Sequence, residues 1–252
     1  MMLKKCVMLF LLCGLVWLPE LRAEYGYRRK KLDSKKYDNH SIIVRQIEPQ
    51  RSPVGGRLPS GNIAEKNAKR FFEVMDKLPP SFIKRSGLKY VTVLEHLTLN
   101  NVPAGGVASG DSIYLSVNFT EKTVYHELFH IFDPTSRDKK WTRLNDKKFV
   151  YTGSEFKKES VNSVKRKRRE RNLQEGTFDA DFVSRYAMSN EKEDRAETFA
   201  CMVSEGKGFM ARCEKSPVLR RKMEFIINLT SKNKLISRDF WSEVLGEDFS
   251  GK

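Results

Sequence analysis

The feature that most constrains the fold is the run from His126 to His130, which reads HELFH. Its two histidines are four residues apart, so on a helix their rings lie on one face, one turn above the other. Leu128 and Ile131 supply an apolar face for that helix, and Thr120 can cap its start. The sequence therefore predicts a core helix after Thr120 that presents two imidazoles to one point.

Two imidazoles and a carboxylate form a ligand set that suits Zn2+ and leaves a fourth position for water. In such a site the metal lowers the pKa of water to about 7, and Glu127, between the two histidines, would accept its proton as the general base. The chain has only four histidines, so finding two of them at this spacing around a glutamate is informative. The alternative is an ordinary helix with two surface or core histidines.

The third ligand must come from elsewhere in the chain. A metzincin would need Gly at position 133 and His at position 136, where this chain has Asp133 and Ser136, so that class is excluded. Glu193 and Glu197 lie four apart on a later predicted helix. We assign Glu193 as the ligand and Glu197 as the carboxylate that accepts a ring N–H from a ligand histidine. The reverse assignment stays open, and so does a solvated helix face.

These residues, together with Tyr186 seven positions before Glu193, resemble the catalytic domain of anthrax lethal factor and the secreted clostridial Pro-Pro endopeptidases, which are gluzincins. The resemblance covers about residues 63–211. It implies that Tyr186 stabilises the oxyanion and that Asp133 supports the ligands without binding the metal. It also implies that residues 105–115 include the edge strand on which an extended substrate lies.

The apolar pattern indicates an α+β fold, that is, a zincin-like domain with a small twisted sheet, the HExxH helix and a helical C-terminal part. Pro79-Pro80 is expected to end the first helix, and an extended peptide is expected to pair with the strand at Ile113–Leu115. The expected elements are a helix over 63–78, strands over 90–94 and 112–116, the helix after Thr120, and helices after Phe182, Ser216 and Ser237.

The N-terminal part of the chain predicts export. Residues 1–23 have the basic, apolar and small-residue order of a secretory signal peptide, and their apolar run is shorter than the ~20 residues of a membrane span. Residues 24–61 are polar with several Pro and Gly, which predicts an extended arm, although the apolar patch at 42–44 could add a strand. Residues 62–252 form the predicted zinc metallopeptidase domain. A retained membrane anchor is the alternative for the first segment.

The net charge of +15 is concentrated in a basic insertion, residues 134–176. Between positions 134 and 172 there are fourteen Lys or Arg and five Asp or Glu, which gives +9. Residues 137–171 are therefore expected to attract anionic surfaces, while a solvated loop without a partner is equally compatible. The run 165–171 contains no aromatic residue for base stacking, so no specific nucleic acid is predicted.

Two cysteines remain after removal of the signal peptide, Cys201 and Cys213. In an exported chain they predict one disulfide, and the alternative is two buried thiols.

Taken together, the sequence predicts a secreted zinc-dependent endopeptidase of the gluzincin type. One alternative is a non-catalytic or decayed zincin that acts as a basic surface-binding or adhesion module. Another is a zinc hydrolase that acts on a substrate other than a peptide.

Overall fold

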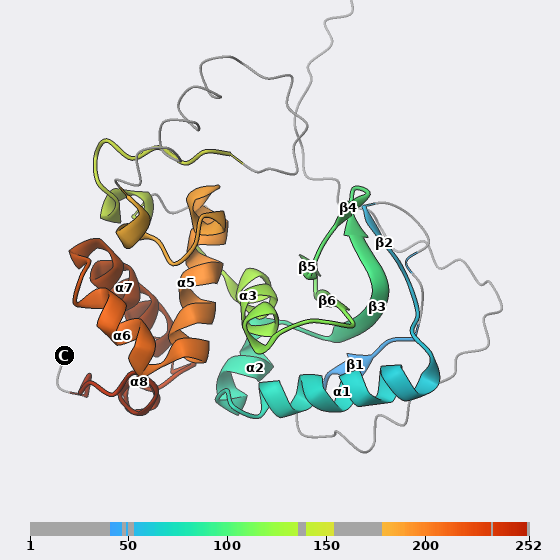
Figure 1. Cartoon of the computed structure of the whole chain (residues 1–252). Coiled ribbons are helices and arrows are strands. Elements are labelled where there is room, and N and C mark those ends of the chain that lie inside the picture. The colour runs from blue at the N-terminus through green and yellow to red at the C-terminus, as the bar shows by residue number, and fades with distance from the viewer. Residues whose placement is uncertain are drawn as a thin grey trace, which may run out of the picture.

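The computed structural model describes residues 41–46, 49, 53–135, 140–153, 178–232 and 234–250. The predicted signal peptide and residues 24–40 of the predicted arm lie outside this part, as do residues 136–139 and 154–176 of the insertion. Figure 1 shows the sheet and α1 (Gly61–Met75) on one side of the molecule, α3 (Glu121–Phe132) in the middle and the C-terminal helices on the other side.

Within the described residues, the sheet has six strands arranged around β3. The strands are β1 (Ile43–Val44), β2 (Val54–Arg57), β3 (Tyr90–Leu99), β4 (Val102–Pro103), β5 (Gly106–Ser109) and β6 (Ser112–Ser116). Their order is β1-β3-β6-β5, while β2 and β4 pair with the C-terminal half of β3. β1 and β6 run parallel to β3, and β5 runs antiparallel to β6. Both predicted strands are therefore present, and β3 extends five residues beyond its predicted end.

The strand available to an extended peptide is β5 and not β6. Ile113 of β6 pairs with Val91 of β3 on one side and with Ala108 of β5 on the other. The backbone groups of β6 are therefore used by both neighbours. The expected pairing of a substrate with Ile113–Leu115 is wrong for this reason. In the described part of the chain β5 pairs only with β6, which leaves the other side of β5 without a strand.

Two strands come from the segment expected to be an extended arm. β1 forms at the apolar patch and runs beside β3, and Ile42 next to it is buried. β2 pairs antiparallel with β3, and Val54 enters a small second core with Leu94 and Val107. Residues 42–44 and 54–57 therefore belong to the sheet, because their apolar side chains find partners there.

The first helix, α1 (Gly61–Met75), begins and ends slightly before its predicted bounds. Pro79-Pro80 predicts only a helix end, but a second helix, α2 (Pro80–Ser86), starts at this point. Proline is well suited to the first helical position, where its missing N–H costs no hydrogen bond. Gly87, with φ 89°, then ends α2 in the left-handed conformation.

α3 begins after Thr120, as predicted. The Thr120 hydroxyl accepts a hydrogen bond from the Thr123 amide, and the Thr123 hydroxyl accepts one from the Thr120 amide. This capping box satisfies amide groups that the first helical turn leaves unpaired. Val124 and Leu128 are fully buried in the main core, together with Ile113 of the sheet. The cap and the apolar face together fix how the helix presents its histidines.

The C-terminal part is helical, which confirms the α+β class. Ser216 and Ser237 cap helices as predicted, since their hydroxyls accept hydrogen bonds from the Leu219 and Phe240 amides. The helices are α5 (Glu191–Glu205), α6 (Lys207–Cys213), α7 (Pro217–Lys232) and α8 (Arg238–Leu245), with short 3-10 turns η2 (Thr142–Leu144), η3 (Asp179–Asp181) and η4 (Tyr186–Met188).

The described part of the basic insertion, residues 140–153, is not wholly a surface loop. Trp141 is fully buried and Phe149 is 9% exposed, and both belong to the main core. The Phe149 ring packs against the Phe182 ring with 4.4 Å between centroids. Trp141 and Phe149 therefore anchor this segment in the core through their aromatic side chains, so it is not simply the solvated loop that its basic composition suggests.

The predicted disulfide is not formed. Cys201 and Cys213 are both free and buried. The Cys213 sulfur lies 4.0 Å from the Met223 sulfur, whereas Cys201 lies near Lys122. Burial raises the pKa of both thiols to about 12. The structure therefore agrees with the alternative of two buried thiols.

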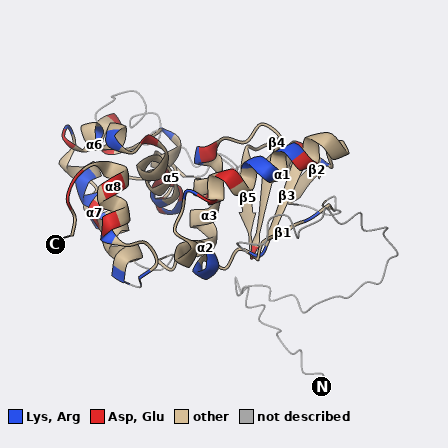
Figure 2. Cartoon of the chain, turned by 90° about the horizontal axis from the view of Figure 1, so that it is seen from below, with Lys and Arg blue, Asp and Glu red and all other residues tan. Residues whose placement is uncertain are grey.

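The surface of the described part carries charges of both signs. Figure 2 shows acidic and basic residues interspersed along α1, as expected for a solvated helix face. None of the helices described here combines the length and the apolar character needed to cross a membrane.

Candidate metal centre

Three side-chain atoms from two helices meet at one point. The Nε2 atoms of His126 and His130, both on α3, lie 3.0 Å apart. Each of them lies 3.1 Å from Oε2 of Glu193 on α5. The three residues that the sequence assigns as ligands are therefore brought together in an almost equilateral triangle.

The histidine pair owes its geometry to the period of the helix. One helical turn separates His126 and His130, and their ring centroids lie 4.6 Å apart at an interplanar angle of 83°. The rings are therefore not stacked on each other, and each can direct its Nε2 atom to the same point.

Glu193 reaches this point because of how α5 begins. The Asn190 side chain caps the helix by accepting hydrogen bonds from the Lys192 and Glu193 amides. Ala196 and Ala200 further along α5 are fully buried. Small residues at these positions allow α5 to pack closely along α3, which brings the Glu193 carboxylate up to the two rings.

The donor set fits a zinc ion. Three donors around a four-coordinate zinc lie about 3.3 Å from one another, because each bond is about 2.0–2.1 Å long. The 3.0–3.1 Å separations seen here are slightly shorter and enclose one centre. Two imidazole nitrogens and one carboxylate oxygen are also the donor types of catalytic zinc sites.

Glu197 contacts the outer nitrogen of a histidine and stays out of the triangle. Its Oε1 lies 2.9 Å from Nδ1 of His126. Its Oε2 accepts hydrogen bonds from the Ser184 hydroxyl at 2.7 Å and the Lys122 ammonium at 3.0 Å. A carboxylate in this position orients the ring and favours the tautomer whose Nε2 is free to bind a metal. The structure thus favours the first of the two assignments left open by the sequence.

The cluster favours a positive charge at its centre. Burial alone would lower the pKa of His126, but its contacts with the Glu193 and Glu197 carboxylates outweigh this effect and raise the pKa to about 10. Burial would raise the pKa of Glu193, but contacts with His126 and His130 hold it well below its usual range. The carboxylates therefore stabilise either a proton on the ring or a metal ion.

Glu127 lies beside the triangle without being part of it. Its side chain is buried, and its carboxylate accepts a hydrogen bond from the Ala108 backbone N–H of β5. Burial raises the pKa of Glu127, although His126 and His130 oppose the shift. A carboxyl group with a raised pKa is better matched to proton transfer near neutral pH.

Tyr186 faces the same site from η4. Its ring centroid lies 6.0 Å from that of His126, and its hydroxyl hydrogen-bonds the Glu193 carboxylate. Burial, followed by the charges of Glu193 and Glu127, raises the pKa of the phenol above its ordinary value. The hydroxyl therefore keeps its proton and can act as a hydrogen-bond donor.

Four of the residues described above, His126, Glu127, Tyr186 and Glu197, line a hollow of about 300 Å³ beside β5 and α3. The loop before β5 forms one wall, and the N-terminal half of α3 forms the other. The lining residues are Pro103, Ala104, Gly105, Gly106, Thr120, Lys122, Thr123, His126, Glu127, Tyr186 and Glu197.

The sequence profile of a family described as "Putative zinc-binding metallo-peptidase" matches residues 97–243. The chain belongs to this family. The matched range contains both histidines and Glu193, so the family description and the donor triangle point to the same kind of site. The sequence has no match among curated proteins.

The fold of this family member is also similar to that of a solved structure. A protein of the same description from Bacteroides caccae ATCC 43185 superposes with a TM-score of 0.52. The two sequences are 14% identical, and the likeness covers 84% of this chain and 87% of that one. At this level of identity the comparison concerns the fold alone, and it agrees with the predicted zincin-like α+β class.

Asp133 does not line the metal centre of this metallo-peptidase family member. Its Oδ2 accepts a hydrogen bond from Nε of the fully buried Arg195 at 2.8 Å, and its Oδ1 accepts bonds from the Thr135 amide and hydroxyl. Asp133 therefore joins the end of α3 to α5. The prediction that Asp133 supports the metal ligands without binding the metal stays a prediction; its described contacts are with Thr135 and with Arg195 on the helix that carries Glu193.

Two residues that hydrogen-bond Oε2 of Glu197, Lys122 and Ser184, are not predicted from the sequence. Lys122 lies four positions before His126, and this spacing alone indicates that the two share a helix face. Ser184 lies in a stretch without regular structure, so no periodic signal points to it.

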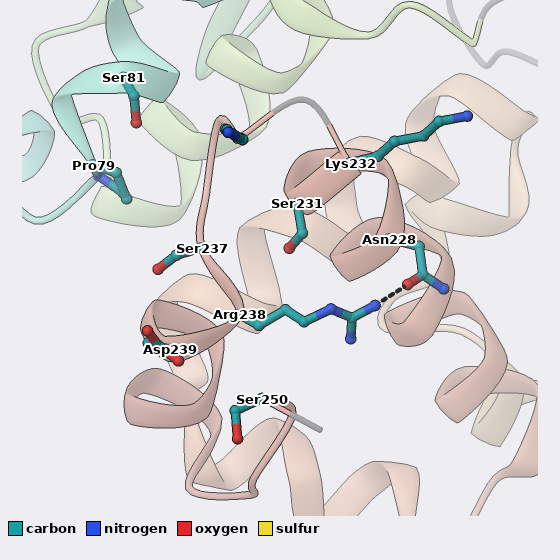
Figure 3. Close-up of a pocket in the computed structure, with 10 residues that line it drawn as sticks. Pro79, Ser81, Asn228, Ser231, Lys232, Ser237, Arg238, Asp239 and Ser250 are labelled. Carbon is teal, nitrogen blue, oxygen red and sulfur yellow. Dashed lines mark hydrogen bonds between the residues drawn. The ribbon is translucent and has the colours of Figure 1, made fainter. Parts of the chain in front are cut away.

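A second and larger hollow, of about 880 Å³, lies away from these residues, where α7 and α8 approach the start of α2 (Figure 3). Arg238 is held there by a hydrogen bond to Asn228 at 2.7 Å. The lining residues are Pro79, Ser81, Asn228, Ser231, Lys232, Lys234, Ser237, Arg238, Asp239 and Ser250. This lining contains none of the predicted site residues, so size alone does not identify the site.

Proposed function

We propose that this protein is a secreted zinc-dependent endopeptidase of the gluzincin type. The observation that carries the proposal is the triangle of His126, His130 and Glu193, with the Glu127 carboxylate buried beside it. Two histidines from one helix and a glutamate from a second helix are the gluzincin arrangement suggested by the likeness to anthrax lethal factor. Tyr186 in the same hollow supports this reading.

The residues divide the chemistry among them. A zinc ion held by the triangle would polarise the scissile carbonyl and lower the pKa of water. Glu127 accepts a proton from the attacking water and passes it to the leaving amine. Tyr186 donates a hydrogen bond to the oxygen on which negative charge develops. Glu197 holds the His126 ring in position through Nδ1.

The substrate is proposed to lie along β5. This strand pairs with β6 on one side only in the described part of the chain, and its residue Ala108 contacts Glu127. An extended peptide that adds to such an edge forms main-chain hydrogen bonds, which hold it without regard to sequence. A peptide bound there would lie beside Glu127 and the hollow, which suits cleavage within a chain.

We also propose that residues 1–23 direct export of the protein and that residues 137–171 attract anionic surfaces.

Cleavage-site profiling of the mature protein on a peptide library, with and without a chelator, tests the proposed endopeptidase activity. Cleavage that stops with the chelator and returns with added zinc supports the proposal. A metal-free, inert protein that binds anionic lipid or polysaccharide would instead identify a binding module.

Replacing Tyr186 by phenylalanine is expected to retain zinc but to lower kcat by a factor on the order of 10²–10³, because one donor to the developing oxyanion is lost. Metal content and steady-state kinetics of the purified variant check this result. An unchanged kcat would remove Tyr186 from the mechanism.

Replacing Gly106 by alanine is expected to displace the general base. A Cβ at Gly106 would lie 2.7 Å from Cγ and Oε1 of Glu127 and 2.9 Å from Cγ2 of Thr123. Either β5 or Glu127 must then move, and a shift of this kind can lower kcat/KM about a hundredfold while zinc stays bound.

The matched control is Gly105→Ala. A Cβ there would meet its nearest atom, Cγ2 of Thr123, at 3.9 Å, which is an ordinary contact. Similar kinetics for the two variants would show that the close approach of β5 to Glu127 is unimportant.

A further inference from the structure

Three consecutive residues at the start of α5 point to three different partners. Glu193 reaches the metal triangle, Asp194 faces a buried polar cluster, and Arg195 binds Asp133 at the end of α3. Asp194 and Arg195 are both fully buried. The candidate metal ligand is therefore followed directly along the chain by two residues with buried ionic contacts.

Asp194 is the acceptor at the centre of the cluster. Its Oδ2 accepts hydrogen bonds from the Trp141 indole N–H at 2.9 Å and the Tyr151 hydroxyl at 2.8 Å. The Lys222 ammonium on α7 lies 2.9 Å from the same oxygen. Lys222 also donates to the Asp181 carbonyl and lies over the Phe182 ring, 3.5 Å from its centroid.

Two of these donors come from residues 140–153, which we call the clasp segment. Beyond Trp141 and Tyr151, its backbone also binds the chain just before α5. The Thr152 amide donates to the Met188 carbonyl at 3.0 Å, and the Gly153 amide donates to the Ser189 carbonyl at 2.8 Å. The clasp segment therefore contacts both the turn that carries Tyr186 and the first turn of α5, which carries Glu193.

Leaving a hydrogen-bonding position of a buried carboxylate without a partner costs free energy. Each donor therefore restricts where the Asp194 carboxylate can lie. Asp194 and Glu193 are neighbours on the first turn of one helix. A displacement of the Asp194 carboxylate would therefore move the Glu193 backbone as well. The positions of metal ligands are sensitive to such supporting contacts, whose removal costs 10–100-fold in affinity in typical sites.

We propose that Asp194 is a positioning residue and that the clasp segment, through Trp141 and Tyr151, holds Glu193 and Tyr186 in place for metal binding and catalysis. This inference rests on the proposed metal site. In this proposal the described part of the basic insertion supports the active site through contacts with α5 and η4, and none of its residues touches the metal or the substrate.

The test compares two tryptophans in the full mature protein. Trp141 and Trp241 are both fully buried, and each donates one indole hydrogen bond, to Asp194 at 2.9 Å and to Thr230 at 3.0 Å. The substitutions Trp141→Phe and Trp241→Phe remove equivalent groups from the two places. Tyr151→Phe removes a single hydroxyl and serves as the mildest variant if Trp141→Phe does not fold.

The readouts are zinc affinity, by competition with a chelator, and thermal unfolding of the metal-stripped proteins. We expect Trp141→Phe and Tyr151→Phe to bind zinc at least tenfold more weakly, and Trp241→Phe to bind it within twofold of wild type despite a similar loss of stability.

Two results would overturn the inference. One is wild-type zinc affinity in both Tyr151→Phe and Trp141→Phe, and the other is an equal loss of affinity in Trp241→Phe. Failure of the proposed metal site, on which the inference rests, is distinct, because the wild-type protein would then not bind zinc at all.

Discussion

Replacing Glu127 by glutamine is expected to lower peptide hydrolysis by a factor on the order of 10³ while zinc remains bound, because an amide cannot accept the proton of the attacking water. The Glu127 carboxylate lies outside the donor triangle, so the metal loses no ligand. Glutamine has nearly the same shape, and its amide oxygen can keep the hydrogen bond from the Ala108 N–H. The change therefore separates proton transfer from metal binding.

Metal analysis and kinetics on the same preparation provide the measurement, and Glu191→Gln provides the control. Glu191 is also on a helix near the site, but its carboxylate accepts a hydrogen bond from Thr142 and does not line the hollow. Glu191→Gln is expected to retain activity. Loss of zinc from Glu127→Gln, or activity close to that of wild type, would contradict the proposed role of Glu127.

The parts of the fold that are predictable from the sequence are those with local signals. Thr120 caps α3, Ser216 and Ser237 cap later helices, and the strand at 112–116 has its predicted bounds. Each depends on a short-range pattern, such as a capping hydroxyl or a run of apolar residues between turns. The histidine pair belongs to the same group, because the helical period alone places both rings on one face.

The errors concern how elements meet in space. β6 has its predicted bounds but lies inside the sheet, and strand order is not encoded in the apolar pattern of one strand. Trp141 lies in a segment of strongly basic composition, yet it is buried through contact with α5 and α7. Cys201 and Cys213 invite a disulfide by number alone, whereas the structure gives them separate surroundings.

The same distinction applies to the site. Spacing gives Glu193 and Glu197 a common helix face but cannot say which of them meets the histidines at Nε2. The fold decides between them, since α5 directs its first turn to the triangle and its second turn to Nδ1 of His126. The roles of Lys122 and Ser184 also depend on this placement, because both bind the outer oxygen of Glu197.

The substitutions Glu193→Gln and Glu197→Gln should therefore differ strongly in their effect on zinc, although the chemical change is the same. Each removes one negative charge and keeps the size of the side chain. In Glu193→Gln the metal loses an anionic ligand, and we expect the zinc affinity to fall more than a hundredfold. This loss exceeds the 10–100-fold loss of affinity that follows removal of a contact that only supports a ligand. In Glu197→Gln the amide oxygen can still accept from Nδ1, so a loss of about tenfold is expected.

Zinc affinities of the two variants, measured by chelator competition at one pH, check this order. The reverse assignment of the two glutamates makes the opposite prediction, with the larger loss in Glu197→Gln. Equal losses would mean that both carboxylates bind the metal, which is incompatible with the 2.9 Å contact of Glu197 to Nδ1 of His126 and its bonds to Ser184 and Lys122. The ratio of the two affinities is thus a direct measure of how far the triangle in the structure describes the metal-bound enzyme.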